Sequence, residues 1–544
     1  MKSMSSVGEA VVLPTLSQSE ARSELEPAPS VLHPEGPAHD GHEPGEGNRQ
    51  QASAPPAIRS LEAPRKSRVY VNRNLRLDRI EMVGFDMDYT LAIYNQAAIE
   101  ELSMRATLDK LVVNKGYPEA IRHLAYDPAL AIRGLVIDKA NGNVFKPDRY
   151  GFPGRARHGL GAVDRHRITE LYQRERVRLS TRRYAWIDTL FALPEAVLYI
   201  CLVDYFDHHE VAAKPDYATL WENIRECIDL AHRDGSIKEH VRANIANYIT
   251  HDPHLAETLH KLRSSGKRLF LLTNSAWDYT DPVMAHLLDG QMDAYPAWRS
   301  YFDVIVVSAA KPEFFTEEHP FVELDGDGLP VERSADGPFV RGRIYSGGNL
   351  KQFEVRARAS GDSVLFVGDH IYGDMLRSRK SSSWRTAMVV QELEHEITTS
   401  EGQRSRLVAL DRLDARLVEL DAELHERQSA MRSLLRLDSD LPSEGDDVNN
   451  RLYAAQRAVK DDIDRLRVEL KRVRTEHRTA ERESDLAFNQ HWGPIFREGY
   501  EISKFGEQVE AYACIYTSRV SNLRFYSPMQ YFRGPRDRMP HERL

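Results

Sequence analysis

Short apolar runs that end in polar residues recur along the middle of the chain. Four runs have this form: 80–85, 268–272, 302–307 and 364–367. Continuous apolar runs of this length are typical of strands that are buried on both faces of a parallel sheet. The stretches 255–262 and 282–288 lie on either side of the second run and have the spacing of helices. The pattern therefore predicts an α/β fold with a Rossmann-like parallel-sheet core, formed by residues 67–95 and 262–400.

The segment 96–261 separates the first two runs and is too long to be a simple crossover. It contains three predicted pieces: a helix at 99–115, hairpin-like strands at 134–149 and a helix at 216–231. The hairpin carries an Asn-Gly pair, which is a strong signal for a tight turn. We expect this segment to form an inserted domain of its own.

Leucine and other apolar residues recur at spacings of three and four near the C-terminal end. The two series are Leu407, Leu410, Leu413, Leu417, Leu420 and Leu424, then Val459, Ile463, Leu466, Leu470 and Val473. The Pro-Ser-Glu-Gly stretch 442–445 interrupts them. The region 401–485 is therefore predicted to be an antiparallel helical hairpin with coiled-coil packing, and we favour a packing or oligomerisation role over a catalytic one. The remainder, 486–544, is expected to pack on the body.

The first 66 residues differ in composition from the rest. They contain nine of the 27 prolines and no aromatic residue. Such a segment cannot bury enough apolar surface to offset the entropy of ordering. We expect residues 1–66 to form a disordered tail, with a regulatory docking segment as the alternative.

Composition and charge exclude several classes of protein. The 544 residues are 41% hydrophobic and carry a net charge of −9, which argues against a partner that is a nucleic acid polymer. The three cysteines, Cys201, Cys227 and Cys514, cannot form a disulfide framework and are expected to be buried thiols. No uninterrupted apolar stretch is long enough to span a membrane, and the first residues lack the apolar region of a secretion signal. We therefore expect a cytoplasmic protein.

Two carboxylates follow the first apolar run directly. Asp86 and Asp88 lie two residues apart, so the first could attack an electrophile while the second gives and takes protons. Taken alone, such a pair is also common in solvated loops and in calcium-like sites.

A second pair of carboxylates follows the fourth run. Asp369 and Asp374 flank a glycine, Gly373, that permits a tight turn. Clustered with Asp86, they would repel one another unless a cation were present, and Mg²⁺ prefers oxygen ligands of this kind. The alternative is a charged turn that is capped by its own side chains.

The second and third runs end in groups that can bind an anion. Thr273, Asn274 and Ser275 offer hydroxyl and backbone N–H groups just before a helix, and Lys311 adds a cation. Separately, these residues could be an ordinary helix cap and a surface lysine.

The order of these groups at four successive strand ends resembles the haloacid-dehalogenase-like superfamily of phosphatases. The motifs DMDYTL, LLTNS, YFDVIVVSAAKPEFF, IYSGGN and VGDHIYGDML together resemble the cytosolic purine 5′-nucleotidase family, the type that acts on IMP and GMP. The similarity extends through LFALPEAVLYICLVDYF in the inserted segment to SPMQYFRGPRDRMPHE near the C-terminus. It covers roughly residues 70–544.

The resemblance implies a role for each catalytic residue. Asp86 would be the nucleophile that forms an aspartyl-phosphate. Asp88 would protonate the leaving ribose oxygen and then activate water. Thr273, Asn274 and Lys311 would hold the phosphoryl oxygens.

The resemblance also implies that Mg²⁺ is the cofactor. Asp86, the backbone carbonyl of Asp88, and Asp369 would bind the ion. Asp374 would support the metal from behind or pair with Lys311.

By the same resemblance the inserted domain, 96–261, is a cap that closes over the nucleoside. Phe191 would stack on the base, and Ser275 is assigned to the substrate. Four further residues match a helical segment that the family places around the base: Arg225, Asp229, His232 and Lys238. The first three share one helix face, where ordinary surface charges would also lie.

Some positions depart from the family pattern. Ala192 replaces an asparagine and Arg233 replaces a tyrosine, which leaves the base preference open. At a site where the family binds an adenine-nucleotide effector, Tyr372 and Lys380 match but Asp188 replaces an asparagine.

Three functions compete on these residues. The first is a Mg²⁺-dependent 5′-nucleotidase for nucleoside monophosphates, preferably purine ones, with nucleoside phosphotransfer as a variant of the same chemistry. The second is a phosphatase of another small phosphate ester, and the third is a non-catalytic helical scaffold. The intact carboxylates and Lys311 argue against the third. The family forms tetramers, and we expect a homo-oligomer, either a dimer or a tetramer.

Overall fold

The computed structural model describes residues 62–172, 177, 181–211, 214–331, 337–376, 382–440, 446–536 and 539–542, which belong to the unit Ser60–Leu544. Residues 1–61 of the tail that we expected to be disordered, and the stretch 442–445 expected to interrupt the helices, lie outside the described residues. The last residues of that tail are placed: Ala63 is buried and Arg65–Ser67 form a 3₁₀ turn. The described fold thus begins slightly before the expected boundary.

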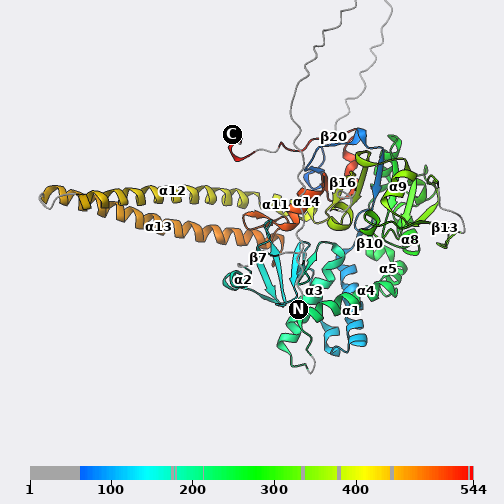
Figure 1. Cartoon of the computed structure of the whole chain (residues 1–544), viewed down its shortest axis with the longest axis horizontal. Coiled ribbons are helices and arrows are strands. Elements are labelled where there is room, and N and C mark those ends of the chain that lie inside the picture. Colours follow the sequence, from blue (N-terminus) through cyan, green and yellow to red (C-terminus); the bar gives the residue numbers. More distant parts are fainter. Residues whose placement is uncertain are drawn as a thin grey trace, which may run out of the picture. The chain divides into compact units, whose positions relative to one another are not determined.

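The predicted core is built around a nine-stranded sheet (Figure 1). In order from edge to edge its strands are β1 (Tyr70–Val71), β19 (Ile515–Thr517), β16 (Arg385–Val389), β15 (Val364–Gly368), β3 (Met82–Phe85), β11 (Arg268–Leu272), β12 (Val304–Val307), β14 (Ile344–Gly347) and β13 (Phe321–Leu324). The two edge strands, β1 and β13, are antiparallel to their neighbours, and the seven between them are parallel. The four apolar runs correspond to β3, β11, β12 and β15, which confirms the predicted α/β parallel-sheet fold. The C-terminal segment contributes β19 to this sheet.

The strands are apolar throughout because both faces of the sheet are covered. In β11, Leu269 and Leu271 belong to one buried cluster, while Phe270 and Leu272 belong to another. The same alternation holds along β3, β12 and β15. A continuous apolar run is what such double-sided burial requires.

The strand order reverses around β3, which lies between β15 and β11. In open parallel sheets, ligands bind beyond the carboxyl ends of the strands at such a reversal. Gly84 in β3 is directly opposite Phe270 of β11, and a Cβ at Gly84 would lie 2.0 Å from the Phe270 ring. Only glycine fits at this position, so the close packing around β3 depends on it.

The inserted segment contains an antiparallel five-stranded sheet and several helices. The strands, in sheet order, are β8 (Gly161–Ala162), β7 (Pro153–His158), β6 (Asn143–Pro147), β5 (Leu135–Asp138) and β9 (Tyr184–Ile187). The helices are α1 (Gln96–Lys115), α2 (Arg165–Tyr172), α3 (Leu193–His208), α4 (Tyr217–Arg233), α5 (Lys238–Ala243) and α6 (Ile245–Tyr248). The predicted helices at 99–115 and 216–231 correspond to α1 and α4, and the predicted hairpin corresponds to β5 and β6.

The remaining elements surround the nine-stranded sheet or form short strand pairs. The helices are α7 (Leu255–Ser264), α8 (Trp277–Leu288), α9 (Leu350–Ala357), α11 (Leu393–Gly402) and α14 (Lys504–Tyr512), and Ile371–Leu376 form a π-helical turn. The pairs are β2 (Leu75–Arg76) with β20 (Tyr531–Phe532), β4 (Ile93–Tyr94) with β10 (Ile249–Thr250), and β17 (Arg497–Glu498) with β18 (Glu501–Ile502).

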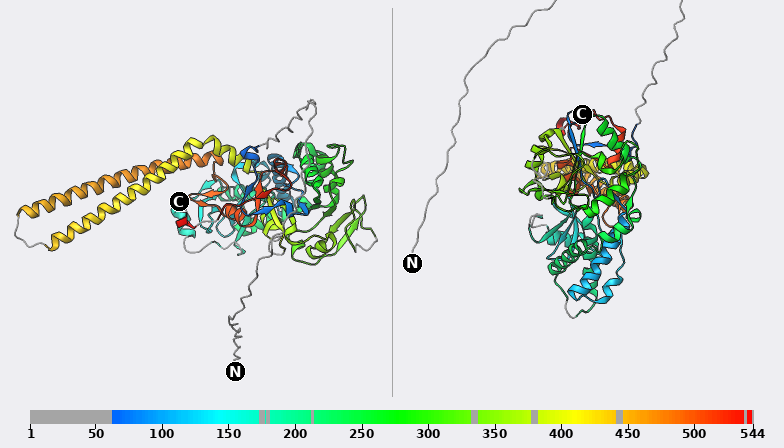
Figure 2. Two further views of the ribbon diagram at one scale, coloured as in Figure 1. Left: turned by 90° about the horizontal axis from the view of Figure 1, so that it is seen from above. Right: turned by 90° about the vertical axis from the view of Figure 1, so that its right-hand side faces the viewer.

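Two long helices, α12 (Arg404–Asp440) and α13 (Asp446–Phe488), lie side by side (Figures 1 and 2). Their antiparallel arrangement follows from the ion pairs Arg406–Glu483 and Arg427–Asp462. Their shared apolar seam is formed by Leu413, Leu417, Leu420 and Leu424 of α12 with Leu466, Leu470 and Val473 of α13. The predicted helical hairpin is therefore confirmed.

The cysteines and the helices bear on two further expectations. Cys201, Cys227 and Cys514 are all buried, and none forms a disulfide. Among the described residues, none of the helices combines the length and apolarity needed to cross a membrane.

Candidate active site

Asp86 lies at the carboxyl end of β3, the strand around which the sheet order reverses. Its Oδ1 accepts a hydrogen bond from the backbone N–H of Met87 at 2.8 Å. Burial is the main cause that raises the pKa of Asp86 to about 7; Lys311 opposes this rise, and the charges of Asp374 and Asp88 add to it. Asp86 therefore depends on nearby positive charge to remain an ionised nucleophile.

Lys311, in the loop after β12, supplies positive charge at this point. Its Nζ lies 3.0 Å from Oδ1 of Asp86 and 2.7 Å from Oδ1 of Asp374. Burial alone would lower the pKa of Lys311, but Asp374 and Asp86 outweigh it and raise the pKa above the ordinary value. Lys311 is thus a buried cation that joins the loops after β3, β12 and β15.

Three carboxylates gather beside Lys311. Asp86, Asp369 and Asp374 each place an oxygen within 4.8 Å of the others. Burial raises the pKa of Asp369, and no group among the described residues donates a hydrogen bond to its buried Oδ2. An orphaned carboxylate oxygen among clustered carboxylates fits a hard divalent cation such as Mg²⁺. The resemblance implied that Asp374 supports the metal from behind or pairs with Lys311. The structure shows the pair with Lys311 and also groups the Asp374 carboxylate with the other two.

The Asp88 side chain lies apart from this cluster. Its Oδ1 accepts a hydrogen bond from the Tyr94 hydroxyl at 2.6 Å, and its Oδ2 accepts one from the Ser275 hydroxyl at 2.7 Å. The Tyr94 hydroxyl also lies 2.9 Å from that of Tyr279. Two hydroxyl groups thus fix the orientation of Asp88, as a proton-transfer group requires. Ser275 was assigned to the substrate; the structure places its hydroxyl on Asp88.

Asn274 connects the loops that follow β11 and β12. Its side-chain amide donates to the carbonyl of Lys311 at 2.8 Å and accepts from the N–H of Lys311 at 2.6 Å. The side chain expected to hold a phosphoryl oxygen therefore holds the Lys311 backbone. Thr273 is buried and its hydroxyl accepts from the N–H of Ser275 at 3.1 Å. In the loop after β12, which also carries Lys311, Ser308 and Ala310 have backbone φ angles of 48° and 55°. Non-glycine residues adopt such angles mainly where the surrounding structure enforces them.

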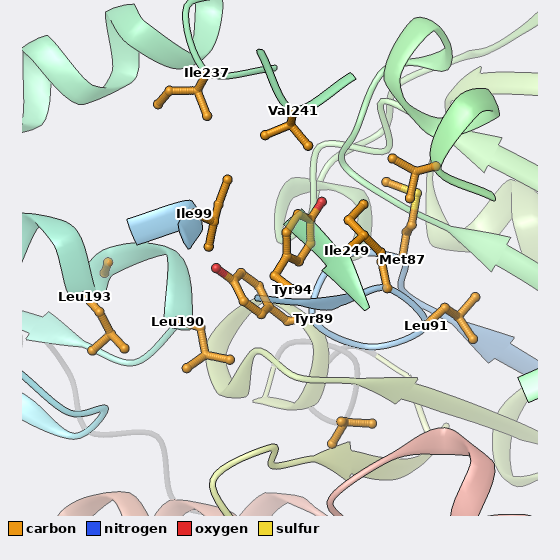
Figure 3. Close-up of a cluster of buried hydrophobic side chains, with 14 of the residues drawn as sticks. Met87, Tyr89, Leu91, Tyr94, Ile99, Leu190, Leu193, Ile237, Val241 and Ile249 are labelled. Atoms are coloured by element: carbon orange, nitrogen blue, oxygen red, sulfur yellow. The ribbon is translucent and has the colours of Figure 1, made fainter. Parts of the chain in front are cut away.

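A pocket adjoins Asp88 and Ser275 on the side of the inserted segment. Its lining residues are Asp88, Tyr89, Tyr94, Ile99, Glu100, Ser103, Phe191, Pro194, His232, Ile237, Lys238, Ser275 and Tyr279. Figure 3 shows part of the wall, where Tyr89 and Tyr94 lie near Ile99. Phe191 is 38% exposed, and its ring meets the Tyr89 ring edge-on with centroids 4.6 Å apart. An accessible aromatic ring in such a pocket can stack on a planar base.

The four polar residues predicted to surround the base divide into two groups. His232 and Lys238 line the pocket, whereas Arg225 and Asp229 do not. Arg225 instead lies 2.6 Å from Glu195, a buried carboxylate on α3, and 3.7 Å from Asp229. The shared helix face of Arg225 and Asp229 therefore carries an ion-pair network that links α4 to α3.

A family model described as the 5′ nucleotidase family matches residues 69–544. The chain belongs to this family. Similar proteins include 5′-nucleotidase domain-containing protein 2 of Homo sapiens, 34% identical over 69% of this chain and 72% of that one, and its Rattus norvegicus counterpart, 30% identical over 90% and 82%. A 5′-nucleotidase domain-containing protein of Dictyostelium discoideum is 29% identical over 87% of this chain and 74% of its own length.

Two solved structures that match part of the chain have low sequence identity and low TM-scores. CbbY of Rhodobacter sphaeroides in complex with phosphate is 14% identical, covers 57% of this chain and 86% of its own, and has a TM-score of 0.21. The L-2-haloacid dehalogenase of Xanthobacter autotrophicus is 13% identical, covers 57% and 78%, and has a TM-score of 0.20. The expected membership of a 5′-nucleotidase family is confirmed, and this member of the family is a phosphoric monoester hydrolase.

The positions where this 5′-nucleotidase family member departs from the expected pattern lie outside the pocket lining. Ala192 is a buried residue of the same 3₁₀ turn as Phe191, and Arg233 donates to the carbonyl of Asp229 on the helix surface. At the site expected to bind an effector, burial raises the pKa of Asp188, and His370 Nδ1 lies 3.8 Å from its carboxylate. The Tyr372 side chain and Lys380 lie outside the described parts.

Arg133 was not anticipated from the sequence. It is buried just before β5, donates to the main-chain oxygen of Asp369 at 3.0 Å, and pairs with Glu392 just before α11. Tyr94 and Tyr279 were also missed. Of these two tyrosines, only Tyr94 lies close in sequence to the catalytic motif, six positions after Asp88, whose carboxylate it contacts.

Proposed function

We propose that this member of the 5′-nucleotidase family is a Mg²⁺-dependent enzyme that hydrolyses nucleoside 5′-monophosphates, preferably purine ones, through an aspartyl-phosphate. The observation that carries this proposal is the position of Asp88. Two hydroxyl groups hold its carboxylate, and Asp88 lines a pocket that contains an accessible Phe191 ring. Asp86, which pairs with buried Lys311, lies two residues before Asp88 in the chain. Asp88 would therefore transfer protons at the phosphoryl group while it also lines the pocket that binds the base.

In the first step Asp86 attacks the phosphorus atom of the substrate. The bond between phosphorus and the ribose O5′ breaks, and protonated Asp88 gives its proton to the departing oxygen. Lys311 offsets negative charge on Asp86 and on the phosphoryl oxygens. Positioning and charge neutralisation of this kind supply most of the catalysis in phosphoryl transfer.

In the second step Asp88, now a carboxylate, takes a proton from water. The water oxygen attacks phosphorus, and the bond to Asp86 breaks. Inorganic phosphate leaves, Asp86 is regenerated and Asp88 is again protonated. The hydroxyl groups of Ser275 and Tyr94 keep Asp88 in the same position for both transfers.

Asp86, Asp369 and Asp374 would hold the metal, with the Asp88 main-chain carbonyl as a further ligand. When bound, Mg²⁺ reduces repulsion between the anionic nucleophile and the anionic substrate. Arg133 would support this group because it fixes the Asp369 main chain.

A nucleoside could replace water in the second step. Its 5′-hydroxyl would give its proton to Asp88 and attack the aspartyl-phosphate, and a new nucleotide would form. The same residues serve both outcomes, so we propose nucleoside phosphotransfer as a side activity. Its test is transfer of labelled phosphate to added inosine.

The decisive experiment is phosphate release from a panel of IMP, GMP, AMP, UMP, CMP, their deoxy forms and an aryl phosphate, with Mg²⁺ and with EDTA. We expect Mg²⁺-dependent turnover of purine nucleotides, and loss of turnover in Asp86→Asn. Asp109→Asn, which changes an exposed carboxylate on α1, is the matched control. Turnover of the aryl phosphate alone would refute the nucleotide assignment, and an active Asp86→Asn would refute the nucleophile.

We also propose that the chain forms a homo-oligomer, a dimer or tetramer, through the α12–α13 hairpin. Val418 and Val468, in the middle of the two helices, are 71% and 70% exposed. The helices meet again at their base, where the Gln403 side chain donates to the carbonyl of Ser484 at 3.2 Å. Replacing residues 407–481 with a short Gly-Ser linker should therefore spare the core, and the native mass by light scattering should fall to that of a monomer. An unchanged oligomer would contradict this role.

A further inference from the structure

Glu100 is a buried carboxyl group in the base pocket that the mechanism above does not use. It lies on the second turn of α1, is 2% exposed, and lines the pocket with Phe191 and His232. Among the residues that the structure describes, none forms a hydrogen bond with its buried Oε1. Its charge also contributes to the raised pKa of Tyr89, which lines the same pocket.

A buried polar atom in a ligand pocket without a partner is best explained by the ligand. Buried polar groups in folded proteins are almost always hydrogen-bonded, and each exception calls for an explanation. The pocket lining combines apolar residues, such as Ile99 and Ile237, with polar ones, such as Ser103 and Lys238. None of the described residues donates to Oε1. A planar base stacked on Phe191 would bring its edge into the same space.

The protonation state of Glu100 defines what it can bind. Burial is the main cause that raises its pKa to about 8, while Gln96 opposes the rise. At neutral pH Glu100 is therefore mostly an uncharged acid, with one oxygen that accepts and one O–H that can donate. An edge with adjacent N–H and acceptor groups, as on a nucleobase, complements this pair.

We propose that Glu100 is the specificity-determining residue of the pocket, and that it accepts a hydrogen bond from an N–H on the edge of the substrate's base. This inference rests on the proposed nucleotidase function and adds to it a chemical requirement: the base must present a donor. Phe191 selects for a flat ring of any kind, whereas Glu100 selects among flat rings. A base without an N–H leaves Oε1 buried and unpaired, and sites built to bind such a group reject analogues that lack it.

The first test measures kcat/KM of the wild-type enzyme for substrates with and without an N–H on the base, and variants follow. Purine riboside 5′-monophosphate has the shape of a purine nucleotide, but its base carries no N–H. For the wild-type enzyme we expect kcat/KM for this analogue to be lower than for the best purine nucleotide by on the order of 100-fold. Equal values would overturn the proposal without any variant having to fold.

Variants at Glu100 then assign the effect to this residue. Glu100→Met should lower kcat/KM for the best nucleotide by a similar factor and leave kcat/KM for ribose 5-phosphate unchanged. For purine riboside 5′-monophosphate kcat/KM should rise, because no unpaired carboxyl oxygen remains to reject this base. Glu100→Gln, which keeps one acceptor and one donor, should retain activity within about threefold. Glu101→Met, at the exposed neighbouring position on α1, controls for changes to the helix.

Three outcomes would count against the proposal in different ways. Equal losses of Glu100→Met on all three substrates would mean that Glu100 only supports the fold. A wild-type enzyme that hydrolyses ribose 5-phosphate but no nucleotide would refute the proposed function itself, and this inference with it. Nucleotide turnover without discrimination against the donor-free base would refute the role of Glu100 alone.

Discussion

The Ser275 hydroxyl donates a hydrogen bond to Oδ2 of Asp88 at 2.7 Å, although the two residues lie 187 positions apart. The contact joins the loop after β11 to the loop after β3, two strands that pair in parallel. The Tyr94 hydroxyl donates a hydrogen bond to the other carboxylate oxygen of Asp88, Oδ1. A carboxyl group that is held on both sides cannot rotate away between the two proton transfers, so these contacts bear on the rate of each step.

Ser275→Ala should therefore reduce kcat more than it changes KM. We expect kcat to fall about tenfold, because proton transfer by a well-placed group contributes on the order of 100-fold or more and Tyr94 would still hold one oxygen. Ser275→Ala with Tyr94→Phe should be worse than either change alone. Steady-state kinetics on the best nucleotide would show this, with Ser264→Ala on α7 as the control. A rise in KM at constant kcat would instead place Ser275 on the substrate.

Lys311→Met should nearly abolish activity and destabilise the protein. Asp86 and Asp374 would then face each other without a cation, and removal of one partner from a buried ion pair costs about 3–5 kcal/mol. Loss of a charge that stabilises the transition state lowers kcat by about 100- to 1,000-fold. We expect the melting temperature to fall in EDTA and to recover partly with Mg²⁺. A variant with wild-type kinetics would show that Lys311 is only structural.

Arg133→Met should raise the Mg²⁺ concentration that gives half-maximal activity. Arg133 fixes the Asp369 main chain, and loss of a group that orients a metal ligand typically costs about 10- to 100-fold in metal affinity or activity. The change also leaves Glu392 without its partner, which lowers stability by itself. The double variant Arg133→Met with Glu392→Gln removes that charge. If it regains thermal stability but still needs more Mg²⁺, the positioning role holds; recovery of both would contradict it.

Local sequence patterns were sufficient to predict the sheet and the catalytic groups at its edge. Asp86, Thr273, Lys311 and Asp369 each follow an apolar run within a few residues, so burial of the run fixes where the polar residue lies. The leucine spacing of the hairpin is similarly local. The apolar runs and the leucine spacing are each contained in one stretch of the sequence. They therefore predict a strand or a helix without any knowledge of the segments that pack against it.

Contacts between distant segments could not be predicted in this way. The Tyr94–Tyr279 and Arg133–Asp369 contacts join residues 185 and 236 positions apart, and nothing near either residue in the sequence indicates its partner. The same holds for Ser275, whose hydroxyl was assigned to the substrate. Glu100 has the sequence environment of an ordinary helix surface, because only the packing of α1 against the cap and core buries it.

Stability should depend on pH through Glu100 and His232 in opposite directions. Burial raises the pKa of Glu100 from 4.5 to about 8, so the folded state binds the extra proton and wild-type stability falls as pH rises across that range. Burial, aided by Lys238, lowers the pKa of His232 from 6.5 to about 4, so stability falls as pH drops across that range. Relative to wild type, Glu100→Gln should gain stability toward pH 8 and His232→Gln toward pH 4, at about 1.4 kcal/mol per pKa unit. Urea titrations at pH 4, 6 and 8 measure both, and each variant serves as the control for the other. Parallel pH curves for the three proteins would mean that neither group is buried with a shifted pKa.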